Sequence, residues 1–198
     1  MVVNMWKYDY KKGLKERLFN KLTVEIVEKH CLEYKSTLEI GCGTAQLSKL
    51  LRDRYPEGES FMVDSSISAC NYVKDYFYDN HYSFNIQLCD IFLMKYNRKF
   101  DITMSSGFIE HFIGEQQKSL CDIHKKYSKK YIICVVPFAD KKCIEFFKSA
   151  ECKRRYGFQK PLNAMELRKC FEDDKWKEIH SEVYYERNPL LIGIYRRR

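Results

Sequence analysis

The sequence lacks the features that mark membrane, secreted and zinc-binding proteins. None of its apolar runs approaches the roughly 18 residues of a membrane helix, and its N-terminus has no apolar core of the kind found in signal peptides. Its nine cysteines are an odd number, are scattered, and include no C-x-x-C pair, so neither a zinc site nor a disulfide framework is indicated. We therefore expect a cytoplasmic protein without a membrane partner or a metal, with reduced and mostly buried thiols.

Internal repeats, low-complexity tracts and a linker between domains are also missing from the sequence. A chain of 198 residues is long enough for one domain with a substantial core. The share of apolar residues is 45% and that of charged residues is 31%, which is ordinary for a globular protein. The sequence therefore predicts a single domain.

Strand and helix signals alternate along the chain, which predicts an α/β protein with a mostly parallel sheet and helices on both faces. Apolar residues recur at helical spacing over residues 14–34, so a helix is expected before the first strand. Further helices are expected at about 44–54, 66–79, 107–127, 140–152 and 163–173, and strands near 37–40, 60–64, 85–89, 100–104, 131–136, 177–185 and 189–196. Only Arg187 and Asn188 separate the last two strands, which predicts an antiparallel hairpin.

The most informative stretch is residues 37–46, TLEIGCGTAQ, where a short apolar strand opens into a glycine-rich turn and then a helix. Gly41 and Gly43 would let backbone N–H groups approach a ligand closely at a helix N-terminus. A dinucleotide fingerprint needs a third glycine, and Gln46 stands in its place. The two glycines alone would fit a plain turn equally well, so the cofactor has to be inferred from further motifs.

Glu39 before the turn completes the pattern E-x-G-x-G-T, which resembles the first motif of class I S-adenosylmethionine (SAM)-dependent methyltransferases. The resemblance continues at residues 61–64, FMVD, an apolar run that ends in Asp64, 21 residues after Gly43. This run resembles the second strand of the family, whose terminal acid holds both ribose hydroxyls. A carboxylate suits that task because it accepts two hydrogen bonds at once.

Two further segments extend the resemblance in register. Residues 85–90, NIQLCD, resemble the third strand and the following acid, which implies that Asp90 binds the adenine amino group and that the backbone of Ile91 reads the ring nitrogen. Residues 100–112, FDITMSSGFIEHF, resemble the fourth strand and the entry to the next helix in small-molecule members of the family. The close match covers about residues 36–137.

The resemblance implies a seven-stranded sheet in the order 3-2-1-4-5-7-6, with the last hairpin antiparallel. In an open α/β sheet the ligand lies at the carboxyl ends of the strands, where the strand order reverses. One domain, 1–198, is expected, with an N-terminal helical lid over residues 1–35 and a Rossmann-like core over residues 36–198.

The residues that the resemblance assigns to SAM should therefore line a single crevice. The glycine turn would support the methionine and ribose part, and a serine after the fourth strand would contact the amino-acid end. The candidate cofactor residues are Glu39, Gly41, Cys42, Gly43, Gln46, Asp64, Ser65, Asp90, Ile91, Ser105 and Ser106. The alternative for Asp64 and Asp90 is that each caps the helix that follows it, since aspartate is favoured there.

Methyl transfer from a sulfonium is an in-line displacement, so most of the work is to position the acceptor and exclude water. A base is needed only where the acceptor carries a proton that must leave early. His111 is the candidate, since histidine changes charge near neutral pH and is expected one turn into a helix at the crevice. Alternatively His111 only lines the pocket, with Glu110 as an anchoring contact. His81 and His124 are expected to be solvated.

Aromatic side chains are expected to complete the acceptor pocket. Related enzymes fold an N-terminal lid over the cofactor, where this chain has Trp6, Tyr8 and Tyr10, and aromatic lids exclude water and attract a sulfonium. A loop over residues 154–158 should lie on the same edge. The candidate substrate residues are Tyr8, Tyr10, Phe108, Arg155 and Tyr156. Alternatively, the N-terminal aromatics form one more packed surface.

The formal net charge of +8 raises the question of a nucleic-acid acceptor. The basic clusters are dispersed, and charge runs usually form a solvated face. The [N/D]-P-P-[Y/F] segment of base-modifying amino methyltransferases is replaced by SSGF at residues 105–108, and no Pro-Cys pair is present. A small-molecule acceptor is favoured; a peptide or RNA acceptor, or SAM binding without catalysis, are the alternatives. The sequence indicates neither the accepting atom nor the oligomeric state.

Overall fold

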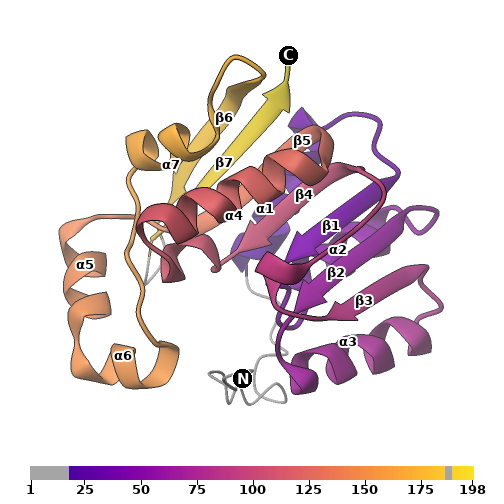
Figure 1. Cartoon of the computed structure of the whole chain (residues 1–198), viewed down its shortest axis with the longest axis horizontal. Coiled ribbons are helices and arrows are strands. Elements are labelled where there is room, and N and C mark those ends of the chain that lie inside the picture. The colour runs from indigo at the N-terminus through magenta and orange to yellow at the C-terminus, as the bar shows by residue number, and fades with distance from the viewer. Residues whose placement is uncertain (1–17, 186–188) are drawn as a thin grey trace.

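A seven-stranded sheet forms the centre of the protein, whose computed structural model describes residues 18–185 and 189–198. The strands follow the order β3-β2-β1-β4-β5-β7-β6 (Figure 1). They are β1 (Ser36–Ile40), β2 (Glu59–Asp64), β3 (Phe84–Leu88), β4 (Phe100–Ser106), β5 (Ser128–Pro137), β6 (Trp176–Tyr184) and β7 (Leu190–Arg197). The strands from β3 to β5 pair in parallel, whereas β7 is antiparallel to β5 and β6. The predicted strand order and terminal hairpin are confirmed.

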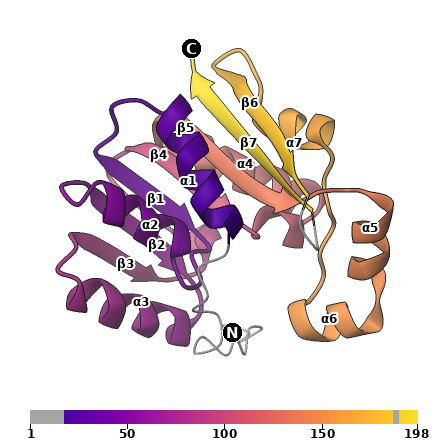
Figure 2. The same ribbon diagram turned by 180° about the vertical axis from the view of Figure 1, so that it is seen from behind.

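Helices cover both faces of the sheet. The α-helices are α1 (Leu18–His30), α2 (Gln46–Arg54), α3 (Ile67–Asp79), α4 (Gly114–Tyr127), α5 (Lys141–Lys148), α6 (Ala150–Tyr156) and α7 (Ala164–Phe171), and the short 3₁₀ turns are η2 (Ile91–Leu93) and η3 (Ile109–His111). Helices α4 and α7 lie on the face seen in Figure 1, and α1 and α2 on the face seen in Figure 2. Helices α5 and α6 form an arm that projects beyond the sheet (Figure 1).

The interior strand β5 shows why both faces are covered. Its side chains alternate, so that Ile132 and Val136 pack into the core beneath α4 and α7, while Ile133 and Val135 pack into the core beneath α1 and α2. All four side chains are essentially inaccessible to solvent. A strand buried on both faces is typical of a parallel sheet that is sandwiched between helical layers, and each layer excludes water from one half of the core.

The helix predicted over residues 107–127 is wrong in its first third. The chain instead forms η3, runs extended through Phe112 and Ile113, and begins α4 at Gly114. Gly107 and Gly114 have φ angles of 65° and 57°, in the left-handed region that favours glycine. Two such positions interrupt a continuous helix and turn Ile109 into the core, where it is fully buried.

The single helix predicted over residues 140–152 is also wrong, because two helices occupy this stretch. Ser149 is extended, with φ −63° and ψ 147°, and separates α5 from α6. Its hydroxyl accepts a hydrogen bond from the Cys152 N–H at 3.1 Å and so caps α6. The predicted helix over 14–34 is observed as α1, which ends at His30; residues 14–17 lie outside the described part.

The cysteines are free thiols and most of them are buried, as expected for a globular core. All nine cysteines are unpaired, and seven of them are buried, whereas Cys89 and Cys170 are partly exposed. The expectation of mostly buried thiols is confirmed. Every helix within residues 18–185 and 189–198 falls short of the length or apolarity that a membrane crossing requires.

A buried carboxylate ties the start of β1 to β4. One Asp101 oxygen accepts hydrogen bonds from the Lys35 N–H at 2.9 Å and from the Ser36 N–H at 3.2 Å. The Ser36 hydroxyl in turn accepts from the Asp101 N–H at 3.1 Å. Burial acts to raise the pKa of Asp101, but these N–H donors together with the charges of Lys130 and Lys129 outweigh it and hold the pKa below its ordinary value of 3.8. The charged form is therefore the one that stabilises the fold.

We expect Asp101→Asn to lower the free energy of unfolding at neutral pH by about 1.5–3 kcal/mol, the usual range for hydrogen bonds to a charged group. Because the folded pKa is lowered, the stabilisation is fully present above pH 3.8 and is lost as the pH falls through the folded pKa. Urea unfolding at several pH values should therefore show a deficit that shrinks in acid. Asp122→Asn, an exposed change on α4, is the control; an equal deficit in both variants would contradict the prediction.

Candidate functional site

The two glycines of the turn after β1 have different surroundings. Both have positive φ angles, 63° at Gly41 and 52° at Gly43, so an L side chain would be strained at either position. A Cβ added at Gly41 would collide with the Phe108 ring, whereas one added at Gly43 would meet nothing within 4 Å. Gly41 therefore makes room for an aromatic ring of the protein, and Gly43 leaves its backbone open to the approach of a ligand.

Asp64 joins the end of β2 to this turn. One of its oxygens accepts from the Gly43 N–H at 2.8 Å, and the other accepts from the Ser66 N–H at 2.8 Å. Burial raises the pKa of Asp64, opposed by the N–H groups of Gly43, Ser66 and Ser65. Ser66, rather than Asp64, caps α3 by accepting from the Ala69 N–H. The capping alternative is thus wrong for Asp64. A carboxylate has about four acceptor sites, so these three N–H donors leave room for one further donor.

Asp90 does cap the turn that follows it. Its Oδ1 accepts from the Phe92 N–H at 2.9 Å at the start of η2. The side chain is exposed and its other oxygen has no hydrogen bond within the described residues, so capping leaves that oxygen open to a ligand. Ile91, the next residue, buries its side chain in the core and holds the turn in place.

Glu39 lies beneath the glycine turn and is only 3% exposed. Its Oε2 accepts from the Ser48 N–H at 2.9 Å in the first turn of α2. Ala45, the N-cap residue of α2, has no side-chain oxygen to offer, so Glu39 supplies the acceptor that the helix start needs. Burial raises the pKa of Glu39 to about 7. Cys42 is buried beside it, and Gln46 is half-buried where α2 begins.

The two serines that end β4 differ in exposure. Ser105 is fully buried, and its hydroxyl lies 3.0 Å from Nε2 of His124, whose Nδ1 donates to the Leu120 carbonyl at 2.8 Å. The expectation that His124 is solvated is wrong, since the ring is fully buried and burial lowers its pKa to about 4. Ser106 is half-buried and is the serine of the pair that a ligand can reach. Ser65 and His81 are exposed.

His111 lies in the turn η3 rather than in the expected α-helix. Its Nδ1 is 2.7 Å from the Phe158 carbonyl, to which it donates, and its Nε2 is 3.3 Å from the side-chain nitrogen of Gln159. Burial lowers the pKa of His111, while hydrogen bonds to the carbonyls of Phe158 and Gly107 act to raise it. Both ring nitrogens therefore face protein groups, and the ring links η3 to the segment before α7.

The neighbouring residue, Glu110, is buried with an incomplete set of partners. The side chain is 1% exposed, and its Oε2 has no hydrogen-bond partner among the described residues. Burial raises the pKa of Glu110 to about 8, so the carboxyl is mostly protonated at neutral pH. Its backbone carbonyl accepts from the Lys160 N–H at 2.8 Å, a second link between η3 and the same segment.

The aromatic candidates are only partly described. Phe108 is half-buried between Gly41 and Phe112, with ring centroids 5.4 Å apart in the Phe108–Phe112 pair. Tyr156 is half-buried and ends α6, so residues 154–156 are helical rather than the expected loop. Trp6, Tyr8, Tyr10 and the side chain of Arg155 lie outside the described residues, and their roles stay predictions.

Sequence reasoning placed Phe158 in a loop at the pocket edge, but it missed Gln159 and the contacts of both residues with His111, which is 47 and 48 residues away. No local motif surrounds them, and only the path of the chain after α6 brings them to η3. The nearest sequence signal was the glycine at position 157, where φ is 72° and α6 ends.

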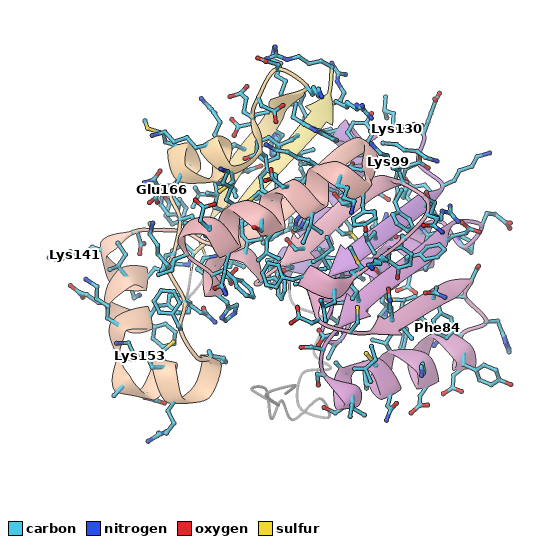
Figure 3. All side chains as sticks on the ribbon, viewed as in Figure 1. Phe84, Lys99, Lys130, Lys141, Lys153 and Glu166 are labelled. Carbon is cyan, nitrogen blue, oxygen red and sulfur yellow. The ribbon has the colours of Figure 1, made fainter. Side chains whose placement is uncertain are left out.

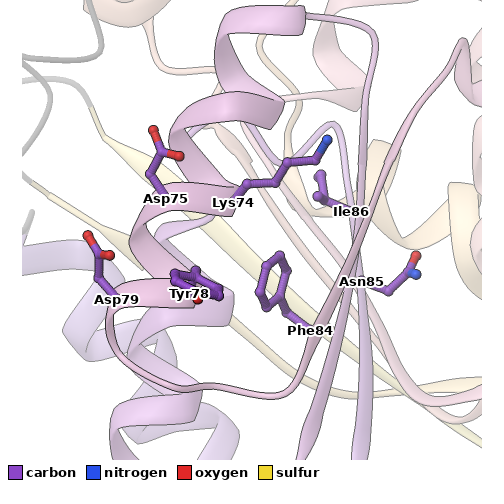
Figure 4. Close-up of a pocket in the computed structure, with 7 residues that line it drawn as sticks. All are labelled: Lys74, Asp75, Tyr78, Asp79, Phe84, Asn85 and Ile86. Carbon is purple, nitrogen blue, oxygen red and sulfur yellow. The ribbon is translucent and has the colours of Figure 1, made fainter.

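Two cavities of the described structure differ in their position relative to this site. A cavity of about 700 Å³ lies between α3 and the edge strand β3, with Tyr78 and Phe84 among its lining residues (Figure 4). Phe84 begins β3, so this cavity is at the opposite end of the strand from Asp90. The second, of about 520 Å³, lies between the arm and residues 158–163, beside His111.

Comparison with known proteins finds sequence similarity to methyltransferases. Residues 37–129 match the family model described as a methyltransferase domain. The malonyl-[acyl-carrier protein] O-methyltransferase of Acetivibrio thermocellus is 27% identical over 109 residues, which are 55% of this chain and 38% of that protein. The match thus spans less than half the length of the curated relative.

Solved structures share the whole fold. The magnesium protoporphyrin IX methyltransferase of Synechocystis PCC 6803, with bound SAH, superposes with a TM-score of 0.74 at 13% identity, over 92% of this chain and 83% of that one. A SAM-dependent methyltransferase from Clostridium acetobutylicum ATCC 824 has a TM-score of 0.71 at 14% identity, over 96% and 92% of the two chains. At these identities the likeness shows a common fold.

The buried Glu110 carboxyl predicts a specific pH dependence of stability. Its folded pKa of about 8 lies above the ordinary 4.5, so its contribution is fully present below pH 4.5 and is lost as the pH rises through about 8. Glu110→Gln, which cannot ionise, should exceed the wild type in unfolding free energy by about 2 kcal/mol at the alkaline end of this window. Chemical unfolding across the window measures the gain. The exposed Glu57→Gln is the control, and a pH-independent difference for Glu110→Gln would refute the prediction.

Proposed function

We propose that this chain transfers a methyl group from SAM to a nucleophilic atom of a small molecule, because residues 37–129 match a methyltransferase domain and the sheet has the strand order that the class I resemblance implies. The observation that carries the proposal is the link between Gly43 and Asp64 at 2.8 Å, which places an open backbone turn and a strand-end carboxylate together. They lie beside the point where the strand order reverses between β1 and β4, where ligands of open α/β sheets bind.

The residues at this edge fit SAM. The open space in front of Gly43 admits a ligand against the backbone, and the Asp64 carboxylate retains acceptor capacity for a ribose hydroxyl. The free oxygen of Asp90 suits an adenine amino group, and Ser106 suits the amino-acid end. When bound, SAM supplies an electrophilic methyl group. Glu39 contributes from below, since it holds the start of α2 rather than facing the open side of the turn.

The remaining work falls to residues that hold the acceptor in line and exclude water. His111 uses both ring nitrogens on protein groups, so we propose that it acts as a positioning residue that fixes the segment of Phe158 and Gln159. An acceptor that is already nucleophilic at neutral pH needs no base, which agrees with a histidine that is held in this way.

Product profiling tests the proposed reaction. Purified protein with labelled SAM is incubated with extracts that contain metabolites, peptides or RNA, and the labelled products are separated by size and chemistry. A labelled small molecule supports the proposal. Label only in peptide or RNA overturns the small-molecule assignment, and SAM binding without labelled product overturns catalysis.

Asp64→Ala should weaken SAM binding by about 1.5–3 kcal/mol, since it removes hydrogen bonds to a charged acceptor. Isothermal titration calorimetry with SAM and with SAH measures the loss, and a thermal melt separates it from unfolding. Asp64→Asn keeps one oxygen and the side-chain volume, so its affinity for SAM should lie between that of the wild type and that of Asp64→Ala. Asp75→Ala on the exposed side of α3 is the control. Unchanged affinity in the Asp64 variants would remove this residue from the site.

A kinetic comparison distinguishes the two roles of His111. As a positioning residue, His111→Ala should raise the acceptor KM and keep the pH profile of the wild type, and His111→Asn, which can still donate to the Phe158 carbonyl, should recover part of the loss. A general base would instead show a turnover loss of about 10²–10⁴ and the disappearance of an acidic limb. That limb would lie below pH 6.5, because burial lowers the pKa of His111.

A further inference from the structure

The cavity beside His111 has an apolar interior and a cationic rim. Its volume is about 520 Å³, within the range of pockets that hold small organic ligands. Ile144 and Phe147 of α5 supply apolar surface, and Phe158 supplies an aromatic ring that is 51% exposed. Lys148, Lys153 and Lys160 also line it, with Glu166 as the acidic residue among them. Such a cavity favours a molecule with an apolar body and a negative charge.

The charge at the rim is not neutralised within the described structure. Lys160 forms an ion pair with Glu166 at 2.9 Å. Lys148 and Lys153 are exposed, and neither has a carboxylate partner within residues 18–185 and 189–198. Because Glu166 is already paired, the cavity carries two lysine charges that a ligand anion can meet at the rim.

The same cavity adjoins the proposed methyl-transfer site. Gln159 lines the cavity and contacts His111, and the Lys160 N–H donates to the Glu110 carbonyl at 2.8 Å. Ala139, on the other side, follows the end of β5. The cavity therefore begins where β4 and β5 end, and the arm of α5 and α6 closes it on the outside, with Lys153 on α6 and Glu166 on α7 (Figure 3).

We propose that this cavity binds the methyl acceptor, and that the acceptor is an amphipathic acid whose carboxylate or phosphate is held by Lys148 and Lys153. The assignment rests on the proposed methyl transfer, since the cavity is an acceptor site only if SAM binds next to it. Ile144, Phe147 and Lys148 share one face of α5 at positions i, i+3 and i+4, so a single helix presents both the apolar wall and the first cation.

Fluorescent probes of matched shape test the charge at the rim. The anionic probe is 8-anilinonaphthalene-1-sulfonate, and the neutral one is N-phenyl-1-naphthylamine. Lys148→Met/Lys153→Met keeps the apolar stems and should weaken binding of the anionic probe by about tenfold or more, with the neutral probe little changed. Lys129→Met/Lys142→Met removes the same charge from exposed positions outside the cavity and should change neither. An equal loss in both double variants would overturn the proposal.

Competition identifies the anionic group. Octanoate and octyl phosphate should displace the anionic probe from the wild type, and octanol should require a concentration about tenfold higher or more. The better of the two acids shows whether a carboxylate or a phosphate is preferred. Displacement by octanol as readily as by octanoate would show that the lysines do not select the ligand, and would overturn the proposal.

Calorimetry with SAM separates this inference from the proposed function. If SAM binds to the wild type and to Lys148→Met/Lys153→Met alike, and labelled methyl transfer to acidic extract fractions falls only in that variant, both proposals are supported. If SAM binds but the acids do not compete, the cavity assignment fails and the methyltransferase proposal stands. If the acids compete but SAM does not bind, the cavity is an anion site and its role as acceptor pocket is overturned.

Discussion

The hydrogen bond from the Gly43 N–H to the Asp64 carboxylate is the contact on which the arrangement of the site depends. It joins the turn after β1 to the end of β2, two segments that are 21 residues apart in the chain. Without it, the left-handed backbone at Gly43 would keep an N–H group with no acceptor in a half-buried position, which is costly. Because Asp64 also receives the Ser66 N–H, one carboxylate fixes the turn and the start of α3 together.

Other ionisable side chains near the same edge are also buried. Their burial costs free energy, which the packing of the apolar layers offsets. Glu39 and Glu110 have pKa values raised to about 7 and about 8, and His124 has one lowered to about 4. In each case burial disfavours the charged form. Raised and lowered values of this kind gather at functional sites more often than elsewhere. Glu39 and His124, however, hold helix and strand ends, whereas a buried Glu110 oxygen has no partner among the described residues.

The sequence predicted the strand ends well because each signal is local, whereas the sheet order was implied by the family resemblance. A glycine that needs positive φ and an acid that ends an apolar run can be recognised within a few residues. The breaks at Ile113 and Ser149 were missed because periodic apolar residues continue across them, while Gly114 and the Ser149 cap decide the local backbone. The burial of His124 was missed because its partners, Ser105 and the sheet beneath, come from a distant part of the chain.

This difference between local and distant signals also explains why the cofactor was easier to predict than the acceptor. Most of the turns and acids that we assign to SAM follow single strands, so a motif contains them. The proposed acceptor cavity combines α5, α6 and residues 158–163, and hydrogen bonds such as His111 to Phe158 connect the last of these to η3. A change in the arm can therefore alter which acid fits without disturbing Gly43 or Asp64.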